Sequence, residues 1–184
     1  MKKVVVLFVS LFVLTFGVYA QTGKVKGVVQ YKYNDYVGFK TDVGAEFYVV
    51  SVNKASNVDI ETWEKYETKT KEYMKYLEYK NDPDIPRDLL LLFTSWGDND
   101  KKVLDELDGK CLEQSLVIKE SCEDFDIIDE SGKYELILPY GEYYILFISK
   151  NRERPTVTEL TGRKIVKKIK VDKPATLLSI EFGY

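Results

Sequence analysis

The chain of 184 residues contains no histidine, and it has only two cysteines and two tryptophans. The missing histidine excludes Ser-His-Asp and Cys-His catalysis, histidine-ligated zinc and haem with a histidine axial ligand. An excess of basic residues is also missing, because 27 lysines and arginines stand against 30 aspartates and glutamates. A nucleic-acid-binding protein should present a basic face. We therefore expect no nucleic-acid partner.

A long apolar run occurs only once, at residues 4–18, after Lys2 and Lys3 and shortly before Ala20. A short cationic start, an apolar run and a small residue at the cut are typical of a secretory signal peptide. The alternative, an uncleaved membrane anchor, needs about 20 apolar residues and fits less well. The pattern predicts a signal peptide over residues 1–20, a mature chain without a transmembrane segment, and export to the periplasm, the cell surface or the medium.

The length predicts one domain over residues 21–184, since domains typically have roughly 100–200 residues. Apolar and polar residues alternate over 24–33, as in a half-buried strand, and residues 45–52 are β-branched and aromatic. The stretch 34–44 between them is rich in turn residues. Strands return near Phe125, and residues 143–149 are apolar on both faces, which predicts a central strand. Further strands are expected over residues 133–138, 162–171 and 176–182.

The middle of the chain has a helical pattern. Residues 59–80 carry apolar and aromatic side chains at spacings of three and four, with Glu and Lys on the other face, which predicts an amphipathic helix. A shorter buried helical segment is expected at 89–93, and a third helix from about Asp100 to Leu107, with Gly109 as its C-terminal cap. The sequence therefore predicts a helical insertion at about 55–122, after the second strand.

Two segments resemble a known family. The first is N-D-x-x-G-x-K-x-D-x-G-A over residues 34–45, and the second is D-E-S-G-K-Y-E-L-I-L-P-Y-G-E-Y-Y-I-L over residues 129–146. Both resemble carboxypeptidase regulatory-like domains, which are transthyretin-like or prealbumin-like β-sandwiches of exported bacterial proteins. The resemblance covers about a third of the mature chain, and its signatures are strands and turns. It implies a mainly β fold, a Greek-key β-sandwich of about seven strands, and it implies no activity.

Cys111 and Cys122 belong to a chain expected to be exported, where a lone pair of cysteines is often oxidised. In one continuous helix they would be about 16 Å apart, beyond the reach of a disulfide. If Gly109 ends the helix and the following residues fold back, the bridge becomes possible. We expect the disulfide, with buried free thiols as the alternative. A catalytic cysteine is not expected, because no histidine is available as its base.

Acidic clusters occur at 98–100 and 123–126. A calcium loop of the EF-hand type starting at Asp98 would need glycine at its sixth position, where Val103 stands. We therefore expect no metal site and no cofactor. A glycosidase needs two opposed carboxylates in a cleft, and no spacing singles out such a pair. The sequence predicts no catalytic residues and a protein that is not an enzyme.

Aromatic side chains provide the binding candidates. Tyr36 and Phe39 fall in the turn-rich stretch and Tyr140 in a later hairpin turn, where side chains project outward. Exposed rings of this kind stack on sugars or anchor a protein partner. Trp63, Tyr66 and Tyr73 are instead expected to pack the long helix onto the sheet. The sequence favours an exported, non-catalytic interaction module that binds a protein. A carbohydrate-binding module is the alternative, and a small glycan-active enzyme ranks third.

Overall fold

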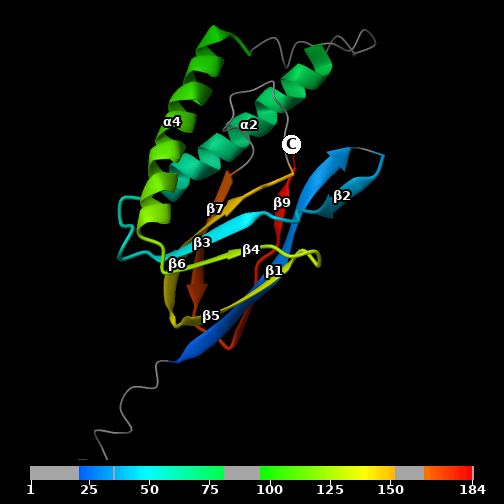
Figure 1. Cartoon of the computed structure of the whole chain (residues 1–184). Coiled ribbons are helices and arrows are strands. Elements are labelled where there is room, and N and C mark those ends of the chain that lie inside the picture. Colours follow the sequence, from blue (N-terminus) through cyan, green and yellow to red (C-terminus); the bar gives the residue numbers. More distant parts are fainter. Residues whose placement is uncertain (1–20, 35, 81–95, 152–163, 184) are drawn as a thin grey trace, which may run out of the picture.

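The computed structural model describes residues 21–34, 36–80, 96–151 and 164–183, which form nine strands and two helices (Figure 1). The elements, in chain order, are β1 (Thr22–Asn34), β2 (Gly38–Thr41), β3 (Glu46–Ser51), α2 (Ile60–Lys80), α4 (Asp98–Glu120), β4 (Asp124–Ile127), β5 (Lys133–Pro139), β6 (Gly141–Ile148), β7 (Lys164–Val171), β8 (Ala175–Leu177) and β9 (Ile180–Phe182).

The first sheet is built around the long strand β1. On one edge β1 pairs antiparallel with β5 through its first half and with β2 through its second half. On the other edge it pairs in parallel with β8 and β9. A close backbone approach at Gly27 makes this edge possible, since a Cβ there would lie 1.8 Å from the Leu178 carbonyl oxygen. Only glycine fits at that position.

The second sheet has the order β4-β3-β6-β7, and all of its pairs are antiparallel. The predicted central strand is confirmed, because β6 lies between β3 and β7 and is buried on both faces. At the edge, β4 pairs only with β3 among the described strands, and all four of its residues are exposed. Asp124 and Asp126, which we call the edge carboxylates, accept hydrogen bonds from the backbone N–H groups of Phe125 and Ile127 at 2.9 and 2.8 Å.

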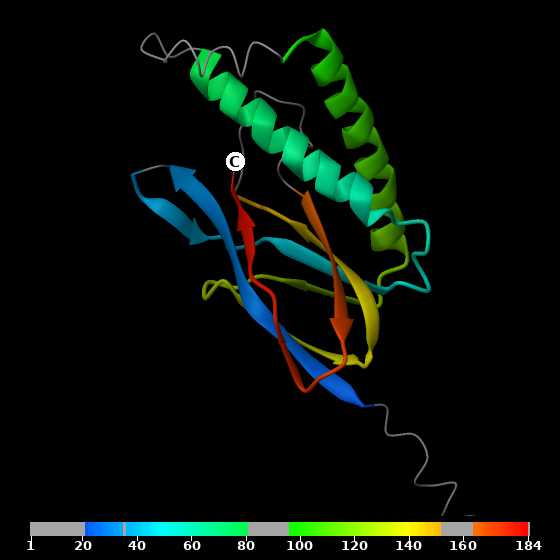
Figure 2. The ribbon, with the colours of Figure 1, turned by 180° about the vertical axis from the view of Figure 1, so that it is seen from behind.

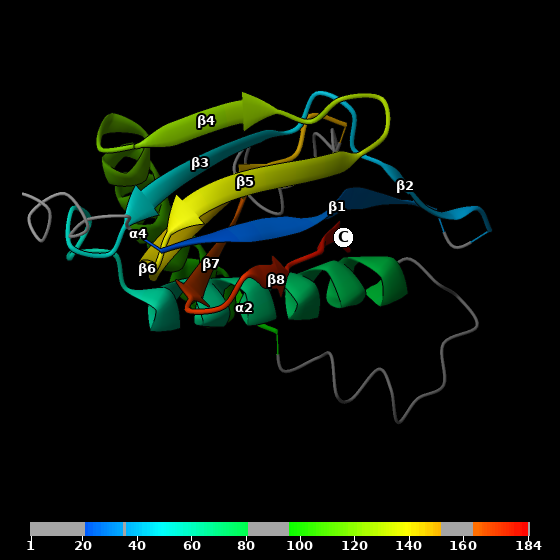
Figure 3. The ribbon, with the colours of Figure 1, turned by 90° about the horizontal axis from the view of Figure 1, so that it is seen from below.

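The two sheets face each other and enclose the main core, so the fold is mainly β and consistent with a β-sandwich (Figure 3). Alternate side chains of β1 and β5 point into this core, as do those of β3 and β6. The largest fully buried side chains of this core include Phe47, Phe147, Phe182, Ile145 and Ile180. Burial of such rings and branched chains contributes about 1.5–3 kcal/mol each to folding.

The helices cover the outer face of the second sheet and form a second core with it. Trp63 and Tyr66 of α2 and Ile118 of α4 pack there against Tyr144 and Leu146 of β6. The packing role expected of the helix aromatics is thus confirmed for Trp63 and Tyr66, and Tyr73 is partly buried against the same core. Neither helix described in the structure combines the length and the apolar character needed to cross a bilayer.

Several details differ from the sequence-based expectation. The described residues form nine strands instead of about seven, because residues 38–41 pair with β1 and because the last run divides into β8 and β9. The helices therefore follow the third strand. Gly109 is not a helix cap, since α4 runs through it to Glu120. The expected signal peptide over residues 1–20 and the helical segment at 89–93 lie outside the described residues.

The strands before the helices pair with the strands after them. In the first sheet β1 pairs with β5, and in the second sheet β3 pairs with β6. The β-structure is therefore built from both halves of the chain, in two sheets. The two helices lie between these groups of strands in the sequence, and after α4 the chain re-enters the second sheet at β4.

Candidate functional site

Exposed aromatic side chains gather at the end of the β1–β2 hairpin. Gly38, with a φ of 77°, allows the turn, and a register shift after Lys32 marks a bulge just before it. The side chain of Tyr36 is fully exposed, and Tyr33, Val37 and Phe39 are 49%, 52% and 42% exposed. We call these four residues the hairpin tip. None of them belongs to either core.

The rings of the hairpin tip lie on both faces of the hairpin. Phe39 is paired with Lys32, whereas Tyr33 lies on the face of Tyr31, and the Tyr31 and Tyr33 ring centroids are 6.4 Å apart. Directly paired residues share a face, and successive residues alternate. The Lys40 ammonium nitrogen lies 3.6 Å from the centroid of the Tyr33 ring, in a cation–π contact that holds this ring in place. The hairpin tip is therefore two-sided.

The third predicted residue, Tyr140, lies at the other end of β1. Its backbone N–H donates to the Gln21 carbonyl at 2.7 Å, and the neighbouring Pro139 pairs with Thr22. Tyr140 is 37% exposed. β1 runs as one long strand along the first sheet (Figure 2). Because it has 13 residues with a rise of about 3.3 Å each, roughly 40 Å separates Tyr140 from the hairpin tip. The structure brings Tyr36 and Phe39 together and leaves Tyr140 apart.

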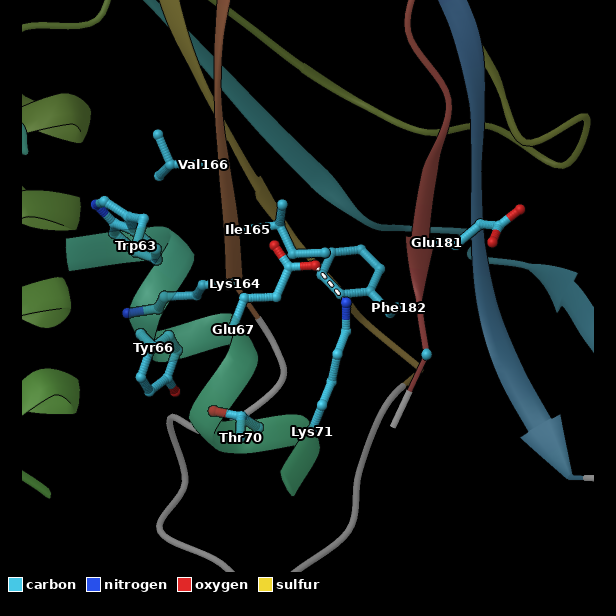
Figure 4. A pocket seen from close by; sticks show the side chains of 11 residues that line it. Trp63, Tyr66, Glu67, Thr70, Lys71, Lys164, Ile165, Val166, Glu181 and Phe182 are labelled. Atoms are coloured by element: carbon cyan, nitrogen blue, oxygen red, sulfur yellow. Dashed lines mark hydrogen bonds and ion pairs between the residues drawn. The ribbon is translucent and has the colours of Figure 1, made fainter. Parts of the chain in front are cut away.

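A second feature, which the sequence did not indicate, is a pocket between α2, β7 and β9 (Figure 4). We call it the helix–sheet pocket, and its volume is about 40 Å³. Its lining residues are Trp63, Tyr66, Glu67, Thr70 and Lys71 from α2, Lys164, Ile165 and Val166 from β7, and Glu181, Phe182 and Gly183 at the C-terminal strand.

Charged groups meet along one wall of the helix–sheet pocket. Lys71 Nζ and Lys167 Nζ lie 2.8 and 3.1 Å from the two carboxylate oxygens of Glu67. Burial acts to raise the pKa of Glu67, but the hydrogen bond from Lys71 and the charge of Lys167 outweigh it and hold this pKa below its usual value. Glu67 is therefore an ionised carboxylate at neutral pH.

A buried hydroxyl lies in the same pocket. The Thr70 side chain is only 6% exposed, and its Oγ1 has no hydrogen-bond partner among the described residues. Most buried polar atoms in proteins are paired, and an unpaired one is costly. Thr70 is thus an unsatisfied hydrogen-bonding group in the wall of a pocket.

Behind the helix–sheet pocket, polar residues of α4 are buried against α2 and β7. The Tyr66 hydroxyl donates to Asp108 at 2.7 Å, and Lys164 Nζ donates to Ser115 Oγ at 3.2 Å. Burial raises the pKa of Asp108, although the Tyr66 hydrogen bond and the Lys164 charge oppose the rise. Burial likewise lowers the pKa of Lys164, and the Lys119 charge adds to this. Shifted pKa values of this kind also occur in active sites.

The contact between Lys164 and Ser115 has the composition of a lysine-activated serine, but its geometry does not suit attack on a substrate. Ser115 is 1% exposed, and its own hydroxyl donates to the Leu112 carbonyl at 2.7 Å. Cys111, beside them, is 2% exposed, and burial raises the pKa of its thiol to about 12, so it stays protonated. Neither of these two nucleophiles reaches solvent.

The disulfide expected between Cys111 and Cys122 is not formed, and both cysteines are free. The physical reason is that α4 continues through Gly109 to Glu120. Eleven residues of nearly continuous helix separate the Cα atoms of the two cysteines by about 16 Å, too far for a bridge. The described residues contain no group of three or more potential metal-ligating acids and cysteines.

Comparisons with known proteins find similar solved structures but identify no family for the chain. No family model matches the chain, and no curated protein matches it. Among solved structures, it is similar to a candidate carbohydrate-binding protein of Pseudomonas aeruginosa, with 12% identity, a TM-score of 0.40, and coverage of 88% of this chain and 89% of the other. The carboxypeptidase regulatory-like family is not confirmed by any of these comparisons.

Two streptococcal pilins are also similar. The minor pilin GBS52 of Streptococcus agalactiae matches with 13% identity and a TM-score of 0.36, over 88% of this chain and 44% of the pilin. The major pilin RrgB of Streptococcus pneumoniae matches with 16% identity and a TM-score of 0.32, over 87% of this chain and 30% of the pilin. All three TM-scores are below 0.5, so no function is transferred from these proteins.

Proposed function

We propose that the protein is an exported, non-catalytic interaction module that binds a protein partner through the hairpin tip. The observation that carries the proposal is the gathering of exposed apolar side chains on a hairpin end that contributes to neither core. Folding does not require large apolar groups there, and contiguous exposed apolar groups mark interaction sites in soluble proteins. Aromatic side chains are the most frequent energetic anchors of protein interfaces.

The two-sided arrangement of the rings supports a protein partner over a glycan. Stacking on a sugar needs rings presented on one face, whereas Tyr33 and Phe39 lie on opposite faces of the hairpin. A two-stranded projection with apolar groups on both faces suits insertion into a groove, in which both faces become buried. Carbohydrate binding remains the second candidate, and the fully exposed ring of Tyr36 favours it.

Export is proposed from the signal-peptide pattern of residues 1–20, which places the partner at the cell surface or in the periplasm. The non-catalytic character is proposed because the sequence contains no histidine and because Ser115 and Cys111 are buried. A small glycan-active enzyme ranks below both binding functions.

The test is a double variant of the hairpin tip, Tyr36→Ser with Phe39→Ser. Its matched control is Tyr140→Ser, which removes a partly exposed ring at the far end of β1. Proteins that co-purify from the native exported fraction are quantified for the wild type, the variant and the control, together with the melting temperature of each. We expect the double variant to lose the enriched partner at an unchanged melting temperature, while the control retains it.

Two outcomes would contradict the proposal. If the double variant and the wild type enrich the same protein equally, the partner binds elsewhere on the surface. If no protein is enriched by the wild type, but glycans shift its melting temperature and the double variant abolishes that shift, the carbohydrate candidate takes precedence.

A further inference from the structure

The backbone of β4 presents two of its four residues to the open edge of the second sheet. Ile128, just after the strand, donates its N–H to the Ala45 carbonyl at 2.8 Å. Residues that face the neighbouring strand alternate along an antiparallel ladder, so the backbone groups of the two aspartates face β3, while those of Phe125 and Ile127 face away. The N–H and carbonyl groups of these two residues are therefore where a further strand would pair.

The two faces of β4 differ in character. Phe125 and Ile127 lie on the face turned toward the helices and are 45% and 53% exposed. Phe125 is paired with Tyr48, and the centroids of the two rings are 4.7 Å apart. The edge carboxylates lie on the opposite face, since Asp126 is paired with Phe47, whose side chain belongs to the main core. An added strand would meet apolar side chains on one face and carboxylates on the other.

The negative charge at this edge is not compensated. Among the residues that the structure describes, no lysine or arginine forms an ion pair with either edge carboxylate, and each accepts only the N–H of the next residue. Asp129 and Glu130, in the turn that follows β4, are also exposed and add charge of the same sign. The edge therefore favours a partner with cationic side chains.

The same charges determine which kind of strand can pair there. A second copy of β4 would bring aspartates directly opposite aspartates, and like charges in that position are destabilising. A strand of alternating apolar and basic residues instead places its apolar side chains beside Phe125 and Ile127 and its cations opposite the edge carboxylates. The carboxylates then leave the N–H groups that they occupy in the free protein, and the added backbone takes their place.

The strand β5 shows a different protection of an edge. Among the described strands it pairs only with β1. Its exposed face carries Lys133 and Glu135, with charges of both signs, and it ends at Pro139, which has no N–H to donate. Lysine and proline are common protections of edge strands. β4 has neither, and its protection consists of carboxylates of one sign, which a basic strand can displace.

We propose that the open edge of β4 binds an extended basic segment of a protein partner by strand addition. The segment runs antiparallel to β4, as in every pair of the second sheet. Its backbone pairs with Phe125 and Ile127, and its lysine or arginine side chains pair with the edge carboxylates. β4 takes no part in the β1–β2 hairpin, so this second site goes beyond the function proposed for the hairpin tip and fails independently of it.

The probe is an eight-residue peptide with blocked ends in which lysine and valine alternate. It is titrated into the exported form of the full chain, and backbone amide NMR is followed at Phe125 and Ile127. We expect saturable shifts of both amides, at a dissociation constant of about 0.1–1 mM. The affinity should fall as the salt concentration rises, because the paired charges are exposed.

Three comparison peptides separate strand addition from charge attraction. In the first, glutamate replaces lysine, and in the second, the four lysines precede the four valines. The third is methylated on the backbone nitrogens of its valines, which are the donors that face β4 when the valines lie opposite Phe125 and Ile127 in an antiparallel pair. Each of the three should bind at least about fivefold more weakly than the alternating basic peptide.

The decisive variant is Asp124→Asn with Asp126→Asn, which removes two charges and keeps an acceptor oxygen for each N–H. The affinity for the basic peptide should fall about fivefold, as expected for the loss of two exposed ion pairs. The matched control is Asp105→Asn with Glu106→Gln, which removes two exposed carboxylates from α4. This control and the Tyr36→Ser variant of the hairpin tip should both retain the affinity of the wild type.

Four results would overturn the proposal. One is the absence of saturable shifts at Phe125 and Ile127 with the basic peptide up to about 5 mM. A second is equal affinity for any of the three comparison peptides. A third is unchanged affinity in the asparagine variant of the edge carboxylates. The fourth is an equal loss of affinity in the α4 control, since binding would then depend on the net charge of the protein.

Discussion

The hydrogen bond between Tyr66 and Asp108 allows a quantitative test of the buried polar row behind the helix–sheet pocket. The Tyr66→Phe variant deletes a hydroxyl that donates to the Asp108 carboxylate at 2.7 Å. Both side chains are nearly inaccessible, at 3% and 8% exposure. The ring of Tyr66 stays in place as phenylalanine, so the packing between the helices and the sheet is retained. The variant therefore removes the donor to a buried carboxylate while keeping the ring.

The expected loss of stability follows from the burial of both groups. Leaving a buried acceptor without its donor costs about 1–3 kcal/mol, and more when the acceptor is charged. We take the loss of unfolding free energy as about 2 kcal/mol. Each kcal/mol lowers the melting temperature of a chain of this size by roughly 2–4 °C, so the melting temperature at pH 7 should fall by about 4–8 °C.

The loss should also depend on pH. Burial already raises the pKa of Asp108 in the folded protein, and the Tyr66 hydrogen bond opposes this rise. Without that bond the folded-state pKa rises further. When a folded-state pKa lies above the unfolded value, the folded protein holds the proton more tightly, and the associated stability is lost as the pH rises through the folded pKa. The deficit of Tyr66→Phe should therefore be larger at pH 7 than near pH 4.

Chemical denaturation of wild type and Tyr66→Phe at both pH values measures this difference. The matched control is Asp108→Asn, which keeps an acceptor oxygen for Tyr66 but removes the charge. In that background Tyr66→Phe should cost less, with no dependence on pH between 4 and 7. An undiminished melting temperature in Tyr66→Phe, or a stability deficit that is equal at pH 4 and pH 7, would contradict the role given to this hydrogen bond.

Three further predictions concern other parts of the fold. Thr70→Val should raise the free energy of unfolding by about 1 kcal/mol in urea, because it removes a buried hydroxyl that has no partner among the described residues. A loss of stability would show that the hydroxyl is satisfied. The double variant Asp124→Ala with Asp126→Ala removes both edge carboxylates and frees two backbone N–H groups of the edge strand β4. We expect concentration-dependent self-association in size-exclusion chromatography. A monomer at all concentrations would contradict the protection of this edge by the two carboxylates. Gly27→Ala should destabilise the protein by more than about 3 kcal/mol, because the added Cβ would lie 1.8 Å from a carbonyl oxygen. Gly109→Ala, which has open space around it in the middle of α4, should instead stabilise the protein by about 1 kcal/mol. Equal effects of the two substitutions on the free energy of unfolding would contradict the packing.

Strong local periodicity made much of the fold predictable. The alternation of β1, the all-apolar run of β6 and the amphipathic pattern of α2 were all identified from the sequence. Local signals failed where the context overrides them. Gly109 suggested a helix end, but the buried stripe of α4 continues to Ile118 and keeps the helix intact. The same continuation explains why the expected disulfide is not formed.

The candidate sites show the same division between local and long-range information. Exposure of Tyr36 and Phe39 follows from their place in a hairpin turn, which the sequence indicates directly. The separation of Tyr140 depends on the register between β1 and β5, which no local pattern encodes. The helix–sheet pocket was missed for a related reason, since its ion pair joins Glu67 to Lys167 across 100 positions of the chain.

The central claim, that a protein partner binds at the hairpin tip, is tested most directly by site-specific photo-crosslinking. A photoreactive phenylalanine analogue replaces either Tyr36 or Tyr140 in the exported chain, and the native exported fraction is irradiated. We expect one discrete crosslinked protein from position 36 and none from position 140. A discrete product from position 140 alone, or identical products from both positions, would contradict it.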